Sequence, residues 1–338
     1  MLVGVMLLCL SPVAGLRAEA TSDTPVSRSE QVLGTQCTIT LYDHGDPAAL
    51  DACFDRLREI HARMTVDEPG SELDAVADAA GRRPVAVTDD VFVVMRRALE
   101  LSRLSNGIFD PTVGPLVKLW GVNTAGARVP SAAEIAAARA LVDWRDVVMN
   151  EKDRTIFLKR AGMRLDVGGV GKGYAADEMV RILAARGVKS AMIDLGGNIF
   201  AMGSHPGGAP WKIGIQNPDA PRGAPFGIAE VVNKTVVTSG VYERFFMKNG
   251  KRYHHIMDVH TGEPVDNTVM SATVITDRSF DADGVTLIIL SLGPAEGVKF
   301  GQKLGLNVIV ADTDHRVWVT PGTRKIFTVT DPEFTYAN

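Results

Sequence analysis

A lysine set among glycines is the segment best suited to bind an anion. The run Asp166-Val167-Gly168-Gly169-Val170-Gly171-Lys172-Gly173 directly precedes a helical pattern over 174–186. Amides exposed at a helix start, together with the helix dipole, favour phosphate, and the lysine adds a positive charge. A Walker A loop would need Gly at Asp166 and Ser or Thr at Gly173. The segment therefore predicts an anion site, with phosphate as the favoured ligand, against the alternative of a structural glycine turn.

Two side chains that carry oxygen, Asp283 and Thr286, lie at the start of an apolar helical pattern over 283–292. Their spacing would place a carboxylate and a hydroxyl on one side of the helix. Mg²⁺ is usually held by few carboxylates, carbonyl oxygens, waters and the phosphates of its ligand. The pair indicates a magnesium site, and capping of the helix N-terminus is the alternative.

Two adjacent histidines, His254 and His255, lie in a strand-like stretch that follows Thr238-Ser239-Gly240. Neighbouring residues of a strand point to opposite faces, so a metal site made by both histidines is disfavoured. One of them is expected to act as a general base or as a polar contact to the substrate. An exposed pair without a role is the alternative. A further stretch, Ser105 to Leu116, is rich in Gly and Pro, which indicates a specified loop shape or a plain connection.

The elements that must position these residues alternate irregularly between helices and strands. Helical spacing of apolar residues predicts helices over 47–64, from 89 to about 104 and from 131, where Ser131 and Glu134 form a capping pattern. Strand patterns cover 32–42, 147–149, 155–158, 191–195, 211–216, 227–232, 235–238 and 271–275. Pairs of strands lie between isolated helices. This order predicts an α+β fold with a largely antiparallel sheet flanked by helices.

Composition narrows the class of protein. The chain has 338 residues, of which 46% are hydrophobic and 22% charged, and its net charge is -4 without any basic run. These values are typical of a globular enzyme and argue against a nucleic-acid partner. Residues 1–20 combine a short apolar run with small residues up to Ala20, which predicts a cleaved export signal and a periplasmic or outer-face location. A buried N-terminal helix is the alternative, and an uncleaved start would associate the chain with the membrane.

The motifs in this order resemble those of the ApbE family of FAD:protein FMN transferases. The resemblance covers most of the chain from Leu33 to Gly297, and it rests on these stretches: Leu33-Gly34-Thr35, Pro69-Gly70-Ser71-Glu72-Leu73, Phe109-Asp110-Pro111-Thr112-Val113-Gly114-Pro115, Leu119-Trp120-Gly121, Asp166 to Tyr174, Leu195-Gly196-Gly197-Asn198, Thr238-Ser239-Gly240, His255 to Asp258, Thr261-Gly262 and Ala282-Asp283. It implies a single flavin transferase domain over 21–338 with an α+β, T-fold-like architecture.

The resemblance also implies roles for individual residues. The FAD site would be lined by Leu33, Asp67, Ile108, Phe109, Asp110, Asp166, Lys172 and Met257. Mg²⁺ would be bound by the backbone carbonyl of Gly169, by Asp283 and by a threonine hydroxyl, and His255 and Lys172 would be catalytic. The sequence departs from the family pattern at Leu33, where Met is common, and at Asp67, where Tyr is common. The metal-binding Thr of the family corresponds to Leu287, so Thr286 is the expected substitute.

The activity implied by the resemblance is Mg²⁺-dependent transfer of the FMN moiety of FAD to a Thr or Ser hydroxyl, with release of AMP. The acceptor would be an exported or membrane protein, and electron-transport subunits are the usual partners of the family. An FAD pyrophosphatase that yields FMN and AMP, and a non-catalytic periplasmic FAD-binding protein, are the alternatives. All these interpretations require Lys172 and Asp283 to converge on one diphosphate.

Overall fold

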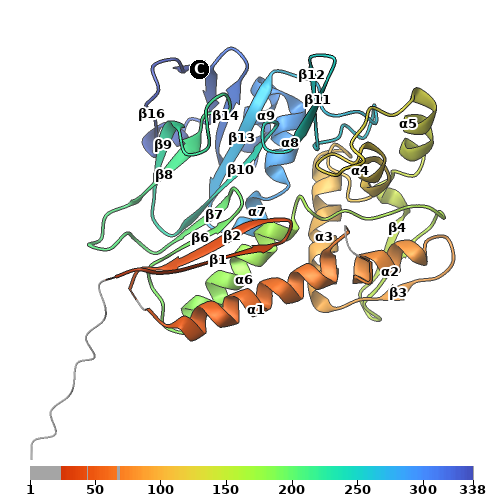
Figure 1. Cartoon of the computed structure of the whole chain (residues 1–338), viewed down its shortest axis with the longest axis horizontal. Helices are drawn as coiled ribbons and strands as arrows, with labels where there is room; N and C mark the ends of the chain where they lie inside the picture. The colour runs from red at the N-terminus through yellow and green to blue at the C-terminus, as the bar shows by residue number, and fades with distance from the viewer. Residues whose placement is uncertain (1–23, 44, 67–68, 338) are drawn as a thin grey trace, which may run out of the picture.

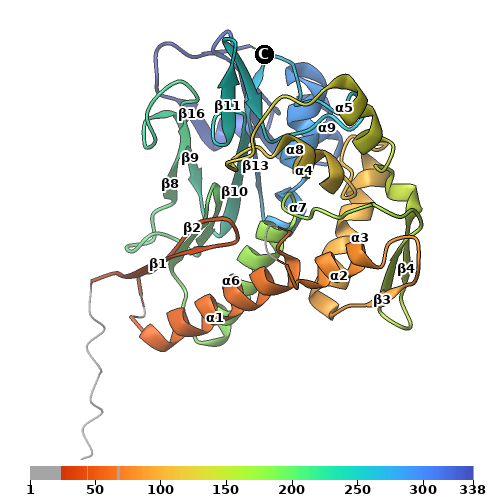
Figure 2. The same ribbon diagram turned by 45° about the vertical axis from the view of Figure 1, so that its right-hand side comes forward.

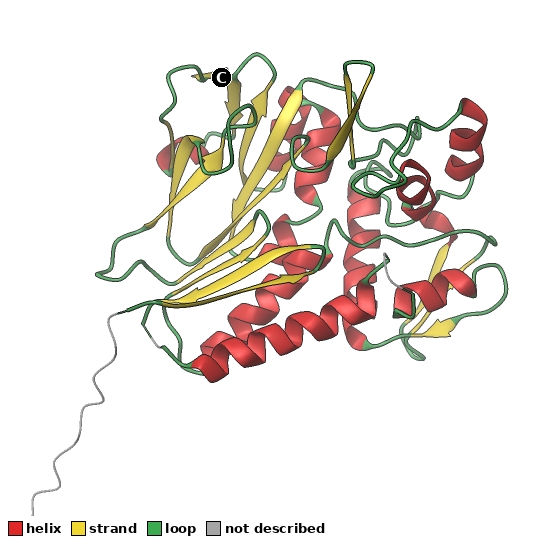
Figure 3. Cartoon of the chain, viewed as in Figure 1, coloured by secondary structure: helices red, strands yellow, loops and turns green. Residues whose placement is uncertain are grey.

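A nine-stranded sheet organises the protein, and helices cover one of its faces (Figures 1 and 3). The structure, a computed structural model, describes residues 24–43, 45–66 and 69–337, so Asp67 and the predicted export signal over 1–20 lie outside the described residues. All neighbouring strands of the sheet are antiparallel except the last pair, which is parallel. The strand order is β1 (Val26–Val32), β2 (Thr35–Leu41), β6 (Ala191–Leu195), β7 (Asn198–Met202), β10 (Lys234–Gly240), β13 (Val269–Thr276), β14 (Asn307–Asp312), β15 (Arg316–Val319) and β17 (Thr335–Tyr336).

The main core lies between this sheet and the helices on its covered face. Its helices are α1 (Pro47–Met64), α3 (Asp89–Leu104), α6 (Gly171–Ala185), α8 (Val285–Leu292) and α9 (Pro294–Lys303). Figure 1 shows α1 and α6 side by side along the β1 end of the sheet. The apolar residues of α1 recur at helical spacing, and Phe54, Leu57 and Ile60 are completely buried.

A second core covers the opposite face of the sheet. A three-stranded sheet of β16 (Phe327–Val329), β9 (Pro225–Val231) and β8 (Trp211–Gln216) packs there. Its aromatic residues Trp211, Phe226 and Phe327 pack with Val236 and Ile309 of the nine-stranded sheet. Strands of the central sheet are therefore buried on both faces, and this explains their continuous apolar runs.

Smaller elements complete the fold, and Figure 2 shows β3 and β4 beside α2 and α3. They are the sheet of β3 (Val85–Ala86), β5 (Thr155–Leu158) and β4 (Val147–Asn150), the hairpin of β11 (Phe245–Lys248) and β12 (Lys251–His254), the helices α2 (Glu72–Asp78), α4 (Gly114–Trp120), α5 (Ala132–Arg139) and α7 (Ser279–Ala282), and the 3₁₀ turns over 144–146 and 323–325. None of the helices in the described part of the chain has both the length and the apolar character of a membrane span.

The α+β prediction with a largely antiparallel sheet is confirmed, and two predicted helix boundaries are wrong. Helix α6 begins at Gly171 rather than after Gly173, so Lys172 lies in its first turn. The predicted helix over 283–292 begins only at Val285, because Asp283 is extended and Gly284 has φ +77°. That conformation is easily adopted only by glycine, and it separates α7 from α8. The extent of the single domain over 21–338 stays a prediction.

Candidate active site

Two tight turns bring separate motifs to one end of the nine-stranded sheet. Leu33 and Gly34 have positive φ and join β1 to β2, while Gly196 and Gly197 do the same between β6 and β7. An ideal Cβ on Gly196 would lie 2.1 Å from Oγ1 of Thr35, so the two turns are in contact and this position requires glycine. This end of the sheet lies near the N-terminus of α6: burial raises the pKa of the Cys37 thiol in β2 to about 12, and the nearby Lys172 ammonium acts in the opposite direction.

The start of α6 is joined to the chain between α7 and α8 by one hydrogen bond. The amide of Gly173 donates to Oδ2 of Asp283 over 2.7 Å. In a regular helix this amide would instead bond to the carbonyl of Gly169, four residues earlier. No hydrogen bond to that carbonyl oxygen is recorded among the described residues. The bond therefore brings Asp283 to the glycine–lysine segment and leaves the Gly169 carbonyl for another partner.

Asp283 and Lys172 form the electrostatic centre of this site. Asp283 is 4% exposed, and its burial raises the pKa of the carboxyl to about 6, while Lys172 and the amides of Gly173 and Gly284 act in the opposite direction. Lys172 is half-buried and has no carboxylate within ion-pair distance in the described part of the chain. The convergence of Lys172 and Asp283 that the sequence analysis required is therefore present.

The backbone amides of the segment contribute less than the sequence suggested. Gly168 donates to Asp166 over 2.8 Å, and Val170 and Gly171 both donate to the carbonyl of Val167. The amide of Gly173 is bonded to Asp283, so most amides of the segment already donate a hydrogen bond within the protein. An anion here would therefore be held chiefly by the Lys172 ammonium and the dipole of α6 rather than by a cradle of amides.

The surroundings of Gly169 are apolar on one side. An ideal Cβ there would lie 2.6 Å from Cδ1 of Leu287 and 3.0 Å from Cε2 of Phe109. An ideal Cβ on Gly284 would lie 3.2 Å from the Gly169 carbonyl oxygen. That oxygen consequently lies beside the residue that follows Asp283. A carbonyl and a carboxylate oxygen in this arrangement are ligands suited to Mg²⁺.

Thr286 is completely buried and already paired. Its hydroxyl lies 2.8 Å from the hydroxyl of Ser239 at the end of β10. The next residue of α8, Leu287, is half-buried and packs against Gly169. The Thr286 hydroxyl is therefore engaged by Ser239, and the side chain that packs against Gly169 is the hydrocarbon of Leu287.

The segment around Asp110 lies next to Asp166. The amide of Asp166 donates to the carbonyl of Pro111 over 2.8 Å. The Asp110 carboxylate is buried and accepts bonds from the amide and hydroxyl of Thr112 and from the amide of Trp144. Burial raises the pKa of Asp110, and these bonds oppose the rise. Asp110 therefore fixes the loop that carries Phe109 and half-buried Ile108.

His255 follows β12 and is anchored by Arg244. The amide of His255 donates to the Arg244 carbonyl over 3.2 Å, and Nδ1 lies 3.3 Å from the same oxygen. A carbonyl only accepts, so Nδ1 carries the proton and Nε2 the lone pair. Burial, followed by Arg244 and Lys172, lowers the pKa of His255 to about 3. The ring is neutral at pH 7, as a proton acceptor must be.

Arg244 also joins this histidine to the N-terminal turn. Its guanidinium donates to the Gly34 carbonyl over 2.8 Å, beside Leu33. The Lys172 ammonium contributes, after burial and Arg244, to the lowered pKa of His255, so the histidine lies near the start of α6 as well as near the turn. Leu33, Lys172, His255 and Asp283 are therefore brought together from four separate parts of the sequence.

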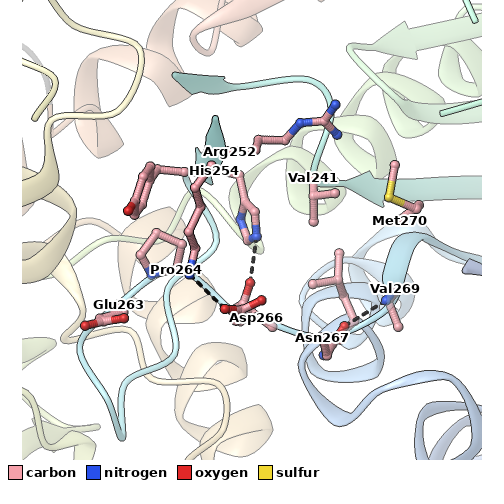
Figure 4. A pocket seen from close by; sticks show the side chains of 13 residues that line it. Val241, Arg252, His254, Glu263, Pro264, Asp266, Asn267, Val269 and Met270 are labelled. Atoms are coloured by element: carbon pink, nitrogen blue, oxygen red, sulfur yellow. Dashed lines mark hydrogen bonds and ion pairs between the residues drawn. The ribbon is translucent and has the colours of Figure 1, made fainter. Parts of the chain in front are cut away.

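His254 has a different environment from His255. It is buried, donates from Nε2 to the Val265 carbonyl over 2.9 Å and accepts at Nδ1 from the amide of Ile256. Burial lowers the pKa of His254. It lines a pocket of about 320 Å³ together with Arg252, Asp266 and Met270 (Figure 4). The residues that line this pocket do not include Lys172, His255 or Asp283, so it is separate from the site described above.

Met257 lies in a small apolar cluster with Leu116, Trp120 and Ile135. It is 8% exposed, and Nε1 of Trp120 donates to the Gly262 carbonyl over 2.9 Å. The cluster fixes α4 and α5 against the chain that follows His255. Met257 therefore supports the wall of the site next to the histidine.

Three residues near the site were missed by the sequence analysis as functional candidates. Ser239 pairs with Thr286, Arg244 holds His255, and Asn198 is 1% exposed with its Oδ1 bonded to Ser279. Nδ2 of Asn198 has no partner in the described structure. Ser239 and Asn198 lie within quoted motifs, whereas no sequence signal distinguishes Arg244 from other surface arginines.

Comparison with known proteins identifies the family. The family model described as the ApbE family matches residues 33–310. The chain belongs to the ApbE family. A FAD:protein FMN transferase of Klebsiella pneumoniae is 37% identical over 80% of this chain and 84% of its own length. One from Treponema pallidum is 33% identical over 98% of this chain and 95% of its own.

Solved structures agree with this assignment. The ApbE protein of Thermotoga maritima superposes with a TM-score of 0.83 at 26% identity, over 90% of this chain and 99% of that one. The flavin transferase ApbE of Vibrio cholerae gives a TM-score of 0.81 at 27% identity, with the same coverage. The resemblance and the fold inferred from the sequence are therefore confirmed.

Proposed function

We propose that this ApbE-family enzyme transfers the FMN half of FAD to a Thr or Ser hydroxyl of an acceptor protein and releases AMP. FAD:protein FMN transferase is the activity named for the curated relatives. The single observation that carries the proposal is the convergence of Lys172, Asp283 and a neutral His255 at one end of the sheet. A diphosphate held there would have a cation-binding oxygen pair on one side and a proton acceptor on the other.

Lys172 would hold the diphosphate by charge. It lies in the first turn of α6, where the helix dipole also favours an anion, and Asp283 is the carboxylate that the ammonium acts on here. Phe109, Ile108 and the Leu33 turn would contact the remaining parts of FAD, with Asp110, Asp166 and Met257 shaping the same wall. The contribution of Asp67 rests on the sequence alone.

His255 would accept the proton of the acceptor hydroxyl at Nε2. The hydroxyl oxygen then forms a bond to the FMN-side phosphorus, the bridging P–O bond of the diphosphate breaks, and AMP leaves with the bridging oxygen. The proton passes from His255 to solvent or to AMP. The lone pair on Nε2 is fixed by the contact of Nδ1 with the Arg244 carbonyl.

The residues around Asp283 fit a magnesium ion. The Gly169 carbonyl oxygen and the Asp283 carboxylate would hold it, and Asp283 is already oriented by the Gly173 amide. When bound, Mg²⁺ neutralises negative charge that grows on the leaving phosphate. We also infer an exported location and an electron-transport subunit as acceptor, and the sequence analysis is the support for both.

Mass spectrometry of acceptor proteins incubated with the enzyme, FAD and Mg²⁺ tests the proposal. We expect an added mass equal to FMN on a Thr or Ser, with AMP in equal amount by HPLC. His255→Asn keeps a polar side chain but removes the base, and we expect transfer to fall by about 10²–10⁴-fold with FAD affinity retained. Free FMN and AMP without any adduct would support a pyrophosphatase, and bound FAD without turnover would support a flavin-binding protein.

A further inference from the structure

The protein offers few oxygen ligands to a cation at Asp283. No group of three or more His, Cys, Asp or Glu side chains able to hold a metal occurs within residues 24–43, 45–66 and 69–337. The Ser279 carbonyl accepts the Asp283 amide, and the nearby Asp177 carboxylate accepts the amides of Ser279 and Phe280. The carboxylate of Asp283 and the Gly169 carbonyl are the oxygens that we assign to a cation. One oxygen of the carboxylate already accepts the Gly173 amide. Mg²⁺ prefers six oxygens, so waters and the phosphates of a ligand must supply most of its coordination.

Two neighbours in α8 limit any further ligand from the protein. The hydroxyl of Thr286 is buried and paired with Ser239. Leu287 is the residue that packs on Gly169, and its methyl groups cannot ligate a metal. Lys172 directly precedes Gly173, whose amide bonds to the Asp283 carboxylate, so its ammonium opposes a lone cation at this site.

We propose that this enzyme captures its divalent cation together with FAD rather than before it, and that Leu287 imposes this dependence. The inference rests on the proposed function of the site. The diphosphate would supply both the missing oxygens and the negative charge that offsets Lys172. By thermodynamic linkage, the cation must then strengthen FAD binding by the same factor by which FAD strengthens cation binding.

Titration of the full chain with Mn²⁺, a spectroscopic substitute for Mg²⁺, tests the dependence without measuring activity. The electron paramagnetic resonance signal of free Mn²⁺ would be recorded with protein alone, with protein and FAD, and with FAD alone as the reference. We expect the affinity for Mn²⁺ to rise at least tenfold when FAD is present, equivalent to about 1.4 kcal/mol of coupling. Equal affinity with and without FAD would overturn the proposal.

Two isosteric variants test the role of Leu287. Leu287→Thr adds a hydroxyl beside Gly169, whereas Leu287→Val has the same shape as the threonine variant without the oxygen. We expect Leu287→Thr alone to bind Mn²⁺ tightly in the absence of FAD. Equal behaviour of the two variants would show that no ligand position exists there and would contradict the assignment of Leu287.

A third variant tests the exclusion of Thr286. Thr286→Val keeps the volume of the side chain and removes its hydroxyl, so we expect the Mn²⁺ affinity in the presence of FAD to remain unchanged. A loss comparable to that of Asp283→Asn would make Thr286 a ligand and overturn the two-oxygen site. Protein flavinylation is measured separately: cation capture that depends on FAD without any adduct would contradict the proposed transfer while leaving this inference intact.

Discussion

Individual residues of the site serve both architecture and chemistry. Asp283 bonds to the first turn of α6 and also faces the position expected for a cation. Asp110 uses its whole carboxylate to shape the loop before α4, although the family resemblance suggested a direct contact with FAD. His255 is held at its amide and at Nδ1 by the Arg244 carbonyl, which leaves only Nε2 for the reaction. These assignments follow from the geometry around each group rather than from residue type.

The pKa of His255 makes a prediction at the scale of the residue. Because its pKa is lowered to about 3 in the folded protein, the unfolded chain binds more protons between that value and about 6.5. Stability contributed by the neutral ring is therefore present above pH 6.5 and is lost as the pH falls. We expect wild type to lose stability more steeply than His255→Asn between pH 7 and 5, by up to about 1.4 kcal/mol per pH unit.

Urea unfolding at several pH values measures this difference. Because His254 remains in both proteins, its lowered pKa cancels from the comparison. Parallel pH profiles of wild type and His255→Asn would show that the imidazole is protonated as easily in the folded protein as in the unfolded chain.

At the scale of elements, the N-terminal half of α6 is fixed by acidic side chains from its neighbours. Asp283 accepts the Gly173 amide, and Asp90 of α3 accepts the Tyr174 hydroxyl over 2.5 Å and the Arg56 guanidinium over 2.7 Å. Within α6, Asp177 accepts the amide of Ser279 at the start of α7. The lysine of the site is therefore carried by a helix that is bonded to three neighbouring elements.

Two glycines in the same turn of α6 provide a matched test of this packing. An ideal Cβ on Gly173 would lie 2.5 Å from the Ser279 carbonyl oxygen, whereas Gly171 has no such neighbour within 4 Å. We expect Gly173→Ala to destabilise the protein by about 1–3 kcal/mol and to weaken FAD binding, because α7 must shift. Gly171→Ala should be neutral or stabilising by up to about 1 kcal/mol, since alanine favours helix.

Thermal melting and FAD titration of both variants measure these effects. Equal stabilities for the two alanine variants would show that α7 can move away from Gly173 without a loss of folding free energy.

At the scale of the whole molecule, the central sheet separates the site from a second core. The helices and the site lie against one face or one end of the sheet, while β8, β9 and β16 cover the other face (Figure 1). The second core contains stacked Phe226 and Phe334, and Phe327 packs edge-on against Phe226. This arrangement predicts that stability and FAD binding respond separately to changes on the two faces.

Phe226 and Phe245 offer the same substitution in opposite environments. Phe226 is fully buried in the second core, and Phe245 on the β11–β12 hairpin is 39% exposed. Phe226→Ala should cost about 3–5 kcal/mol of stability with an unchanged dissociation constant for FAD. Phe245→Ala should change the stability by no more than about 0.5 kcal/mol. Denaturant unfolding and FAD titration check both, and weakened FAD binding in folded Phe226→Ala would contradict the separation of the two faces.

Much of the fold was accessible from the sequence because periodicity and capping report on local structure. Helix α1 has the predicted bounds, and α5 shows the capping box of Ser131 and Glu134. Strand β1 was missed, since its burial alternates between half-buried and exposed residues and its apolar signal is weak. The break at Gly284 was missed because a single glycine does not reveal its φ from the sequence.

Part of the candidate site could be predicted from the sequence, because motifs indicate which residues take part but not which contacts they make. The convergence of Lys172 and Asp283 was anticipated, while the bond of the Gly173 amide to Asp283 was not, because its partner lies 110 residues away. The pairing of Thr286 with Ser239 is similarly a tertiary contact between a helix and a strand. Roles assigned to side chains from spacing alone omit such partners.

The bond between Asp283 and Gly173 affects how the sequences of homologues should be interpreted. A related protein that no longer needed the ion would still be under selection to keep this aspartate. Its carboxylate accepts the Gly173 amide in the first turn of the helix that carries Lys172. Retention of the acid at this position is therefore a poor marker of metal use among homologues. Leu287 packs against Gly169, and the residue type at its position is the more informative feature for sorting them.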